Sequence, residues 1–423
     1  MEWQIPLSDL DYGAEETAAV QRVLDRKWLS MGPETKAFEE EFAAMVGTKH
    51  AIAVSNGTAA LHLAFLALGI RSGDAIIQPA VNFVAAANMT KAAGAVPVFA
   101  DVCSLDEPTL SPTSLDQLLS TLNSQPTTPR PKAVVVMHYG GYFCRMAEIR
   151  ALCEQYGLAI IEDACHAIGA HYCPARRDGP PDQRTAELSF ESGQSTFNSQ
   201  PSTAAGSLGD VGCFSFFSNK NLVTGEGGML TTNRDDIADK ARNLRSHGMS
   251  TLTWDRHRGH AATYDVLAHG YNYRLDDLRS ALGREQLKKL ERNNRRRREL
   301  TALYWDKLDP LEARGWTLPF KRLSTLNSQP STTSSHLIAI VAPDAATRWR
   351  CAEELKAASI QTSLHYPFLP DFAAFRETAD APDLPKSRNF CQRVITLPLY
   401  PTMTEEQVES VCGRLVESAS IDA

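Results

Sequence analysis

Short apolar runs alternate with segments of helical period between residues 49 and 240. The runs are apolar on both faces, as in the strands of a parallel sheet that helices cover on both sides. One of the intervening helical segments, residues 145–157, ends at a glycine. This βαβ alternation predicts an α/β fold with a mostly parallel sheet. The predicted strands are 50–55, 75–80, 96–102, 132–138, 158–164 and 213–217.

A different pattern follows from residue 284. The predicted elements there are a helix over 284–309, a strand over 337–343, a helix over 345–358 and a final helix after Thr404. We therefore expect two domains, because the chain has 423 residues and the two patterns differ. The large domain would span residues 1–283, and a smaller α+β domain would span residues 284–423.

Three near-copies of one polar sequence interrupt these patterns. They contain proline and lack an apolar period, so they cannot contribute to a core. We expect each copy to lie in a surface loop, and a linear recognition motif is the alternative. The copies are STLNSQPTT (120–128), STFNSQPST (195–203) and STLNSQPST (324–332), within inserts near 120–130, 173–205 and 324–334.

The composition of the chain limits the kinds of molecule that the protein is expected to bind. The chain is 43% hydrophobic and 22% charged, and its net charge of -7 gives no electrostatic reason to expect nucleic acid. No apolar stretch reaches the ~18 residues of a membrane span, and the N-terminus lacks the pattern of a secretory signal. The nine cysteines are scattered, without the spacing of a zinc or redox site. We therefore expect a cytoplasmic protein with reduced thiols, without a metal site or a membrane partner.

Three segments carry candidate chemistry, and the first is residues 55–61. It follows a predicted strand and opens an apolar helix. A helix N-terminus offers free N–H groups and a positive dipole end to a phosphate. Gly57 would let the backbone approach closely, and Thr58 could add a hydroxyl. A capped helix start without a ligand is the alternative.

The second segment, residues 162–166, ends the predicted strand 158–164. Ligands of open α/β sheets gather at the carboxyl ends of strands. A carboxylate there, Asp163, could keep the pyridine nitrogen of a cofactor protonated, so that the ring accepts electrons. The alternatives are a helix-capping role for Asp163 and a core position for His166.

The third segment runs from Phe214 to Leu222, before the glycine-rich residues 225–228. A lysine in an enclosed site can lose its proton and attack an aldehyde, which makes Lys220 a candidate. Ser215 could donate a hydrogen bond to a phosphate. The alternative is a surface lysine in a loop before a hairpin.

Taken in this order, the three segments resemble the DegT/DnrJ/EryC1/StrS aminotransferases, also called the sugar aminotransferase family. The matching sequences are SNGTAAL, EDACHA and GSLGDVGCFSFFSNKNL…GEGGML. Further matches lie at residues 28–42, 82–89, 269–287 and 395–408. The resemblance spans nearly the whole chain apart from the inserts. It implies the type I fold of pyridoxal-phosphate-dependent aminotransferases and a homodimer with shared active sites.

The resemblance also implies a role for each matching residue. Lys220 would carry pyridoxal 5′-phosphate and move a proton, Asp163 would pair with the pyridine nitrogen, and His166 would lie near the phenolic oxygen. The other implied cofactor contacts are Phe83 on the ring face, Gly57, Thr58 and Ser215 at the phosphate, and Asn272 at the phosphate of the partner subunit's cofactor.

Lys220 distinguishes reactions within the family, because related sugar dehydratases have His at this position. We therefore expect transfer of an amino group from an amino acid, L-glutamate, to a keto-sugar linked to a nucleotide. The same chemistry on a cyclitol or another biosynthetic ketone is the alternative among enzymes. A regulatory protein that binds the cofactor without turnover is the alternative from another class.

Other stretches depart from the family pattern or add charge. Residues 364–370 lack the second His that the family often carries after its HYP segment. Residues 246–265 predict either a substrate loop or a solvated basic loop. The cationic and aromatic residues of that stretch are Trp254, Arg256, His257, Arg258 and His260. The basic run 291–299 predicts a solvated helix face, and a nucleic-acid-binding face is the weaker alternative.

Overall fold

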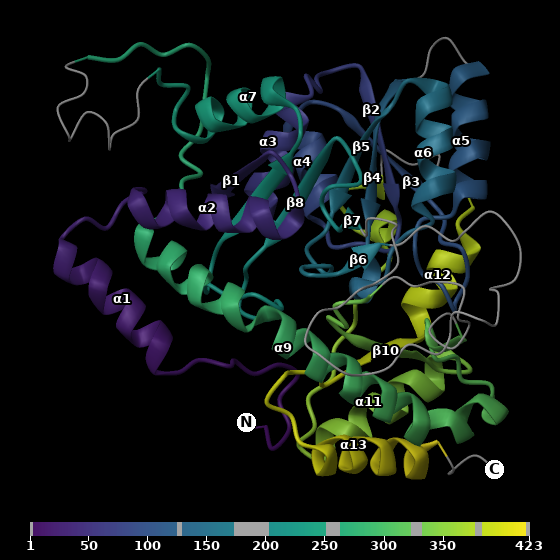
Figure 1. Cartoon of the computed structure of the whole chain (residues 1–423). Helices are drawn as coiled ribbons and strands as arrows, with labels where there is room; N and C mark the ends of the chain where they lie inside the picture. The colour runs from purple at the N-terminus through teal and green to yellow at the C-terminus, as the bar shows by residue number, and fades with distance from the viewer. Residues whose placement is uncertain are drawn as a thin grey trace, which may run out of the picture.

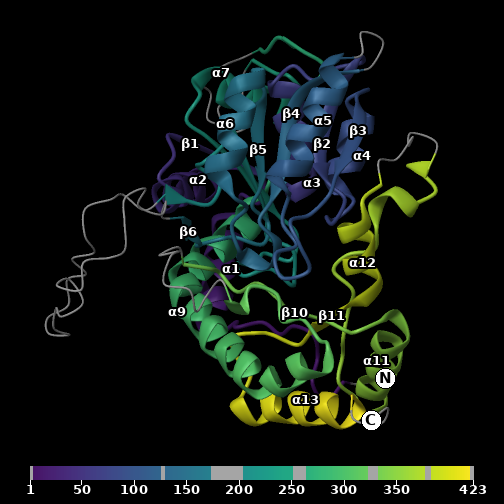
Figure 2. The same cartoon turned by 90° about the vertical axis from the view of Figure 1, so that its right-hand side faces the viewer.

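The computed structural model describes residues 3–124, 129–172, 203–250, 263–322, 332–376 and 383–419. Figures 1 and 2 show two parts, one above the other. The upper part holds a wide sheet with helices on both faces. The lower part holds β10 (Ile338–Val341), β11 (Val394–Leu397), α11 (Ala345–Ala357) and α13 (Glu405–Ser418).

The upper part is built on a seven-stranded sheet of order β1-β9-β8-β5-β4-β2-β3. Neighbouring strands pair in parallel, except that β9 is antiparallel to β1 and β8. The strands are β1 His50–Val54, β2 Asp74–Pro79, β3 Val96–Ala100, β4 Arg130–Met137, β5 Ala159–Asp163, β8 Val211–Ser215 and β9 Gly228–Thr232. All six predicted strands are present, and the predicted α/β fold with a mostly parallel sheet is confirmed.

Helices cover both faces of this sheet, because successive strand residues point to opposite sides. Ile52 and Val54 pack with α3, α4 and α7, whereas Ala51 and Ala53 pack with α2, α5 and α6. The bounds are α2 Pro33–Val46, α3 Gly57–Ala67, α4 Ala85–Ala92, α5 Pro112–Ser124, α6 Met146–Tyr156 and α7 Asp235–Arg245.

The first near-copy is partly helical, so the loop predicted for it is wrong over residues 120–124. These residues form the end of α5. The apolar positions Leu115 and Leu119 continue at Leu122 with helical spacing, and Leu122 packs against the core. The helical period of α5 therefore extends into the copy.

Most of the other two copies lies outside the described residues, together with residues 125–128. Their described ends meet at one short strand, β6 (His171–Tyr172). Tyr172 pairs with Thr203 of β7 (Thr203–Ala204), and His171 forms a bridge with Thr332. Two inserts that are far apart in the sequence therefore leave the fold at neighbouring points.

The long helix α9 (Asp277–Leu308) connects the two parts. It begins earlier than the predicted residue 284, because Asp276 caps it by accepting the N–H of Arg279 at 2.9 Å. The boundary expected between residues 283 and 284 falls inside this continuous helix, and the two-domain division stays a prediction. The N-terminal half of α9 packs on α1 (Ala14–Arg26) and α2.

A separate apolar cluster joins the two parts. It combines residues from the carboxyl-end edge of the sheet with residues of the C-terminal chain, including α12 (Pro385–Arg393). Its members include Ala80, Val81, Met137, Leu337, Tyr366, Phe368 and Phe390. The space at the carboxyl ends of the strands is therefore closed by the lower part.

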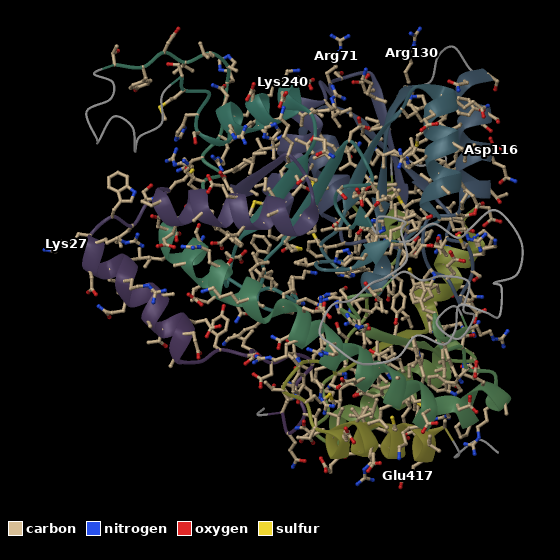
Figure 3. The ribbon with its side chains drawn as sticks, in the orientation of Figure 1. Lys27, Arg71, Asp116, Arg130, Lys240 and Glu417 are labelled. Carbon is tan, nitrogen blue, oxygen red and sulfur yellow. The ribbon has the colours of Figure 1, made fainter. Side chains whose placement is uncertain are left out.

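The outer surface carries charges of both signs. Lys27, Arg71, Asp116, Arg130, Lys240 and Glu417 project from the periphery in Figure 3. Within the described ranges, none of the helices combines the length and the apolarity needed to cross a membrane.

Asp277 ties α9 to the start of α2. Its buried carboxylate accepts the N–H groups of Gly32 at 2.8 Å and Thr35 at 3.0 Å, and the Thr35 hydroxyl at 2.8 Å. Asp277→Ala would leave these donors without an acceptor, so we expect the free energy of unfolding to fall by about 2 kcal/mol or more. Chemical denaturation measures this loss.

Asp344→Ala is the matched control. Asp344 caps α11 at an exposed position, where its carboxylate accepts the N–H of Thr347 at 2.8 Å. This variant should lose only about 1 kcal/mol. Equal losses in both variants would show that the Asp277 contacts add nothing beyond an ordinary cap.

Candidate active site

The three chemistry-bearing segments meet at the carboxyl ends of β5 and β8. Asp163 is the last residue of β5 and Ser215 the last residue of β8. Gly57 begins α3 beside them: a Cβ on Gly57 would lie 2.9 Å from the Ser215 Cβ and 3.2 Å from the Cys165 Sγ. Only glycine allows α3 to approach the strands this closely.

The N-terminus of α3 forms a cradle for an anion. Asn56 caps the helix by accepting the N–H of Ala59 at 2.8 Å. The amides of Gly57 and Thr58 belong to the first turn, which has no intrahelical acceptors for them. They lie beside Ser215 at the positive end of the helix dipole. The cap and the phosphate cradle, weighed as alternatives from the sequence, are compatible because different residues supply them.

Two neighbouring carboxylates point to opposite sides of β5. Glu162 accepts the N–H groups of Gly206 at 2.9 Å and of Leu208 and Gly209 at 2.6 Å each. It also pairs with His138 Nε2 at 3.0 Å, fully buried. Glu162 therefore fixes the loop before β8, whereas the alternation of the strand leaves Asp163 facing the site.

Lys220 lies in the turn that follows β8. Its N–H donates to the carbonyl of Phe217 at 2.9 Å, which fixes the backbone of the turn. Burial lowers the pKa of the Lys220 amine, against the opposing influence of Cys165 and Asp163. A lowered pKa increases the fraction of neutral amine, which is the form that attacks an aldehyde.

Three histidines lie close enough to Lys220 for its charge to act on them. The ring of His166 lies 4.1 Å from that of His336 and 6.4 Å from that of His365, between centroids. Burial lowers the pKa of His166 and His336 well below 6.5, and that of His365 to about 4; the charge of Lys220 adds to each shift. The wall beside Lys220 is therefore made of neutral imidazoles.

The hydrogen bonds of His166 fix its tautomer. The N–H of Gly140 donates to Nδ1 at 3.4 Å, so the proton of the neutral ring lies on Nε2. Nε2 then donates to the Tyr366 hydroxyl at 2.8 Å. Burial raises the pKa of Tyr366 well above 10, so this hydroxyl keeps its proton.

Phe83 and Asn272, the two remaining predicted cofactor contacts, are both exposed. Phe83 is 52% exposed, and its ring lies 5.9 Å from that of Tyr366. Asn272 is exposed beside the end of β1, where Ser55 N–H donates to the carbonyl of Tyr273 at 2.8 Å. The roles assigned to both residues by the resemblance stay predictions.

Sequence reasoning missed several buried residues of this region. His336, Tyr366 and Asn221 received no role, although Asn221 adjoins Lys220.

The solvated face predicted for residues 291–299 is wrong at Asn293, Asn294 and Arg297, which are buried. The reason is that α9 lies between the two parts, so C-terminal segments cover that face. The cationic and aromatic residues at 254–260 lie outside the described residues.

The histidine pKa shifts predict an acid-sensitive fold. His365 is neutral in the folded protein down to about pH 4, whereas an unfolded histidine binds a proton below about pH 6.5. The unfolded chain therefore binds more protons in this window, and stability falls as the pH decreases. His365→Gln should reduce the slope of unfolding free energy against pH by up to about 1.4 kcal/mol per pH unit. An unchanged slope between pH 6.5 and 4 would contradict this account.

Comparisons with known proteins identify the family of the chain. The model of the DegT/DnrJ/EryC1/StrS aminotransferase family matches residues 11–416. Spore coat polysaccharide biosynthesis protein SpsC of Bacillus subtilis (strain 168) is 36% identical over 412 residues, which cover 94% of this chain and 93% of SpsC.

Solved structures show the same fold. The aminotransferase TlmJ from Streptoalloteichus hindustanus is 29% identical, with a TM-score of 0.81 and coverage of 100% of both chains. DesV of S. venezuelae is 30% identical, with a TM-score of 0.80 and coverage of 99% of each chain. The resemblance and the fold predicted from the sequence are thus confirmed. The chain belongs to the DegT/DnrJ/EryC1/StrS family of pyridoxal-phosphate-dependent aminotransferases.

Proposed function

We propose that this enzyme transfers the amino group of L-glutamate to the ketone of a nucleotide-linked sugar, with pyridoxal 5′-phosphate held at Lys220. The observation that carries the proposal is the convergence of Asp163, Lys220 and the start of α3 in one enclosed place. The relative SpsC supports a sugar substrate, because its name assigns it to polysaccharide biosynthesis.

The residues present fit this cofactor. The free amides at the start of α3, with the hydroxyls of Thr58 and Ser215, suit a phosphate, and the lack of a Cβ at Gly57 lets these amides lie next to Ser215. Asp163 is a buried carboxylate that can pair with a protonated ring nitrogen. The cofactor supplies an aldehyde for an amine and a ring that accepts electrons.

The chain itself supplies binding, orientation and proton transfer. The Lys220 amine takes a proton from the reacting carbon and returns it, which requires a pKa near the working pH, and burial moves the pKa of Lys220 in that direction. The neutral imidazoles of His166 and His336 line the same enclosure. They exclude water without adding a positive charge next to Lys220.

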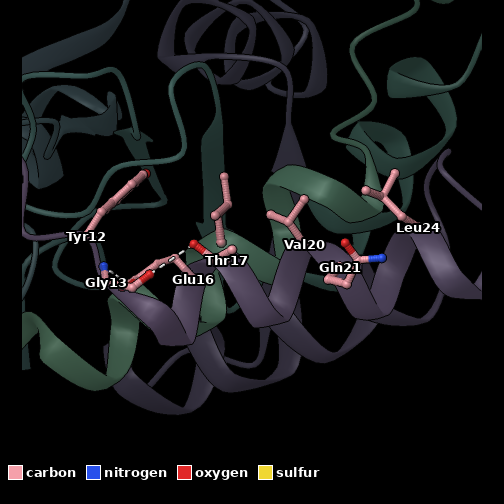
Figure 4. A pocket seen from close by; sticks show the side chains of 8 residues that line it. Tyr12, Gly13, Glu16, Thr17, Val20, Gln21 and Leu24 are labelled. Atoms are coloured by element: carbon pink, nitrogen blue, oxygen red, sulfur yellow. Dashed lines mark hydrogen bonds between the residues drawn. The ribbon is translucent and has the colours of Figure 1, made fainter.

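Exposed apolar surface supports a homodimer with shared sites. A groove of about 460 Å³ follows α1, and Figure 4 shows its lining side chains. The groove is lined by Tyr12, Gly13, Glu16, Thr17, Val20, Gln21, Leu24 and Leu282. Leu10, Tyr12, Leu24 and Leu29 are exposed on or beside this helix. A second copy would cover such a surface, and the exposed Asn272 is available to the partner subunit's cofactor.

A cytoplasmic location is part of the proposal. Eight of the nine cysteines belong to the part of the chain that the structure describes, and none of these eight forms a disulfide bond. Free and mostly buried thiols are typical of proteins in a reducing compartment.

Isotope transfer tests the proposed reaction. We expect the enzyme loaded with cofactor to move ¹⁵N from labelled L-glutamate to a nucleotide-linked keto-sugar, as mass spectrometry of the amino-sugar product would show. Lys220→Ala should abolish the transfer because it removes the amine that moves the proton. Lys240→Ala is the matched control, since Lys240 is exposed on α7 and should keep full activity.

Two different negative results of this experiment would overturn different parts of the proposal. Label that reaches a cyclitol or another ketone, but no keto-sugar, would overturn the proposed acceptor. A loaded protein that accepts no amine from any amino acid would overturn turnover itself and favour a regulatory role.

A further inference from the structure

A short segment before β10 forms part of the wall of the site, although no motif distinguished it in the sequence. Ser334, Ser335 and His336 are buried. The Ser334 hydroxyl donates to the carbonyl of His166 at 2.5 Å, and the N–H of His336 donates to the carbonyl of Gly140 at 2.9 Å. The segment is therefore bonded to the loops that follow β4 and β5.

Asn221 connects the same segment to Lys220, its neighbour in the chain. Its amide nitrogen Nδ2 donates to Asn294 Oδ1 of α9 at 2.7 Å and to the carbonyl of Ser334 at 2.8 Å. The Ser334 carbonyl can only accept, which fixes the orientation of the Asn221 amide. Asn294 in turn donates to the carbonyl of Ile168 at 2.9 Å.

The orientation of Asn221 determines the tautomer of His336. The remaining Asn221 atom, Oδ1, lies 2.8 Å from His336 Nδ1. Because Oδ1 is an acceptor, Nδ1 must carry the proton, and Nε2 of the neutral ring is left as an acceptor. The same ring packs 4.1 Å from that of His166. His336 thus contacts both of the segments that carry the proposed catalytic residues.

We propose that His336 is a positioning residue of this aminotransferase, which holds Lys220 in place through its hydrogen bond to Asn221. The proposal rests on the function assigned to Lys220 above. Without the Nδ1 proton, Asn221 Oδ1 has no donor at this position, and only the two bonds of Nδ2 to Asn294 and Ser334 hold the amide. The Asn221 side chain is then held less firmly, and so is Lys220, which keeps only its own backbone bond to Phe217.

Two substitutions separate the hydrogen bond from the packing. His336→Phe keeps a ring beside His166 but removes the donor to Asn221. His336→Asn removes the ring but places an amide N–H₂ close to the position of Nδ1, so it keeps the donor. Positioning by the hydrogen bond predicts that only the Phe variant is severely impaired.

The first measurement is the rate at which L-glutamate bleaches the visible absorbance of the cofactor-loaded enzyme. His336→Phe should lower the maximal rate about 10- to 100-fold, with the half-saturating glutamate concentration changed by less than about threefold. His336→Asn should stay within about threefold of the wild type. Equal losses in both variants, or no loss in the Phe variant, would overturn the proposal.

Tyr304→Phe is the control for loss of one buried hydrogen bond. The Tyr304 hydroxyl donates to the carbonyl of Pro398 at 2.9 Å inside the core of the lower part. This variant should be less stable to heat but should bleach at the wild-type rate. A rate loss equal to that of His336→Phe would mean that general destabilisation explains both.

Two further readouts do not depend on turnover. Nitrogen NMR of the wild-type protein should show His336 protonated at Nδ1 and not at Nε2, and the opposite tautomer would overturn the proposal. The rate at which the cofactor-free protein binds pyridoxal phosphate should fall in His336→Phe and be restored in His336→Asn.

A wild-type protein that binds the cofactor but does not react with L-glutamate would overturn only the proposed amino donor. The rate of cofactor binding and the nitrogen spectrum would still test the role of His336.

Discussion

The close approach of α3 to the carboxyl ends of β5 and β8 is the contact on which the site depends. At Gly57 a side chain would collide with Ser215, and at Gly228 of β9 a Cβ would lie 2.5 Å from the backbone carbon of Asn56. The two glycines allow the start of α3 to pack directly against β8 and β9. Free amides, a hydroxyl and a lysine are thereby brought together without a dedicated loop.

The electrostatics of the site follow from burial more than from paired charges. Lys220 and the three histidines near it all have lowered pKa values, and desolvation is the first cause in each case. The neighbouring carboxylates, Glu162 and Asp163, point to opposite sides of β5 because successive strand residues alternate. Glu162 is held by three backbone N–H donors and by His138, and Asp163 faces the lysine side. One strand thus supplies a structural acid, Glu162, and the acid proposed to bind the cofactor, Asp163, at successive positions.

The sequence predicted those features that depend on local pattern. The parallel strands were visible as apolar runs, and Gly57, Asp163 and Lys220 each lie within three residues of the carboxyl end of such a run. The strand β9 was missed because it begins with glycine inside a stretch that favours a turn. The early start of α9 was missed because Asp276 was not recognised as a cap.

Long-range contacts could not be predicted in the same way. His336 meets Asn221, 115 positions away in the chain, and Tyr366 meets His166, 200 positions away. No local period marks either pairing. Arg297 stood in a basic run that favoured solvent, yet its guanidinium donates to the carbonyls of His336 and Leu399, and burial lowers its pKa to about 10. Only the packing of the C-terminal segments on α9 explains that burial.

The central claim is that Lys220 bears the cofactor in the enclosure formed by α3, β5 and β8. The most direct measurement is borohydride reduction of the cofactor-loaded enzyme, followed by peptide mass spectrometry. The account predicts that the added cofactor mass lies on the peptide that contains Lys220. Mass on another lysine, or none on a protein that has bound pyridoxal phosphate, would contradict it.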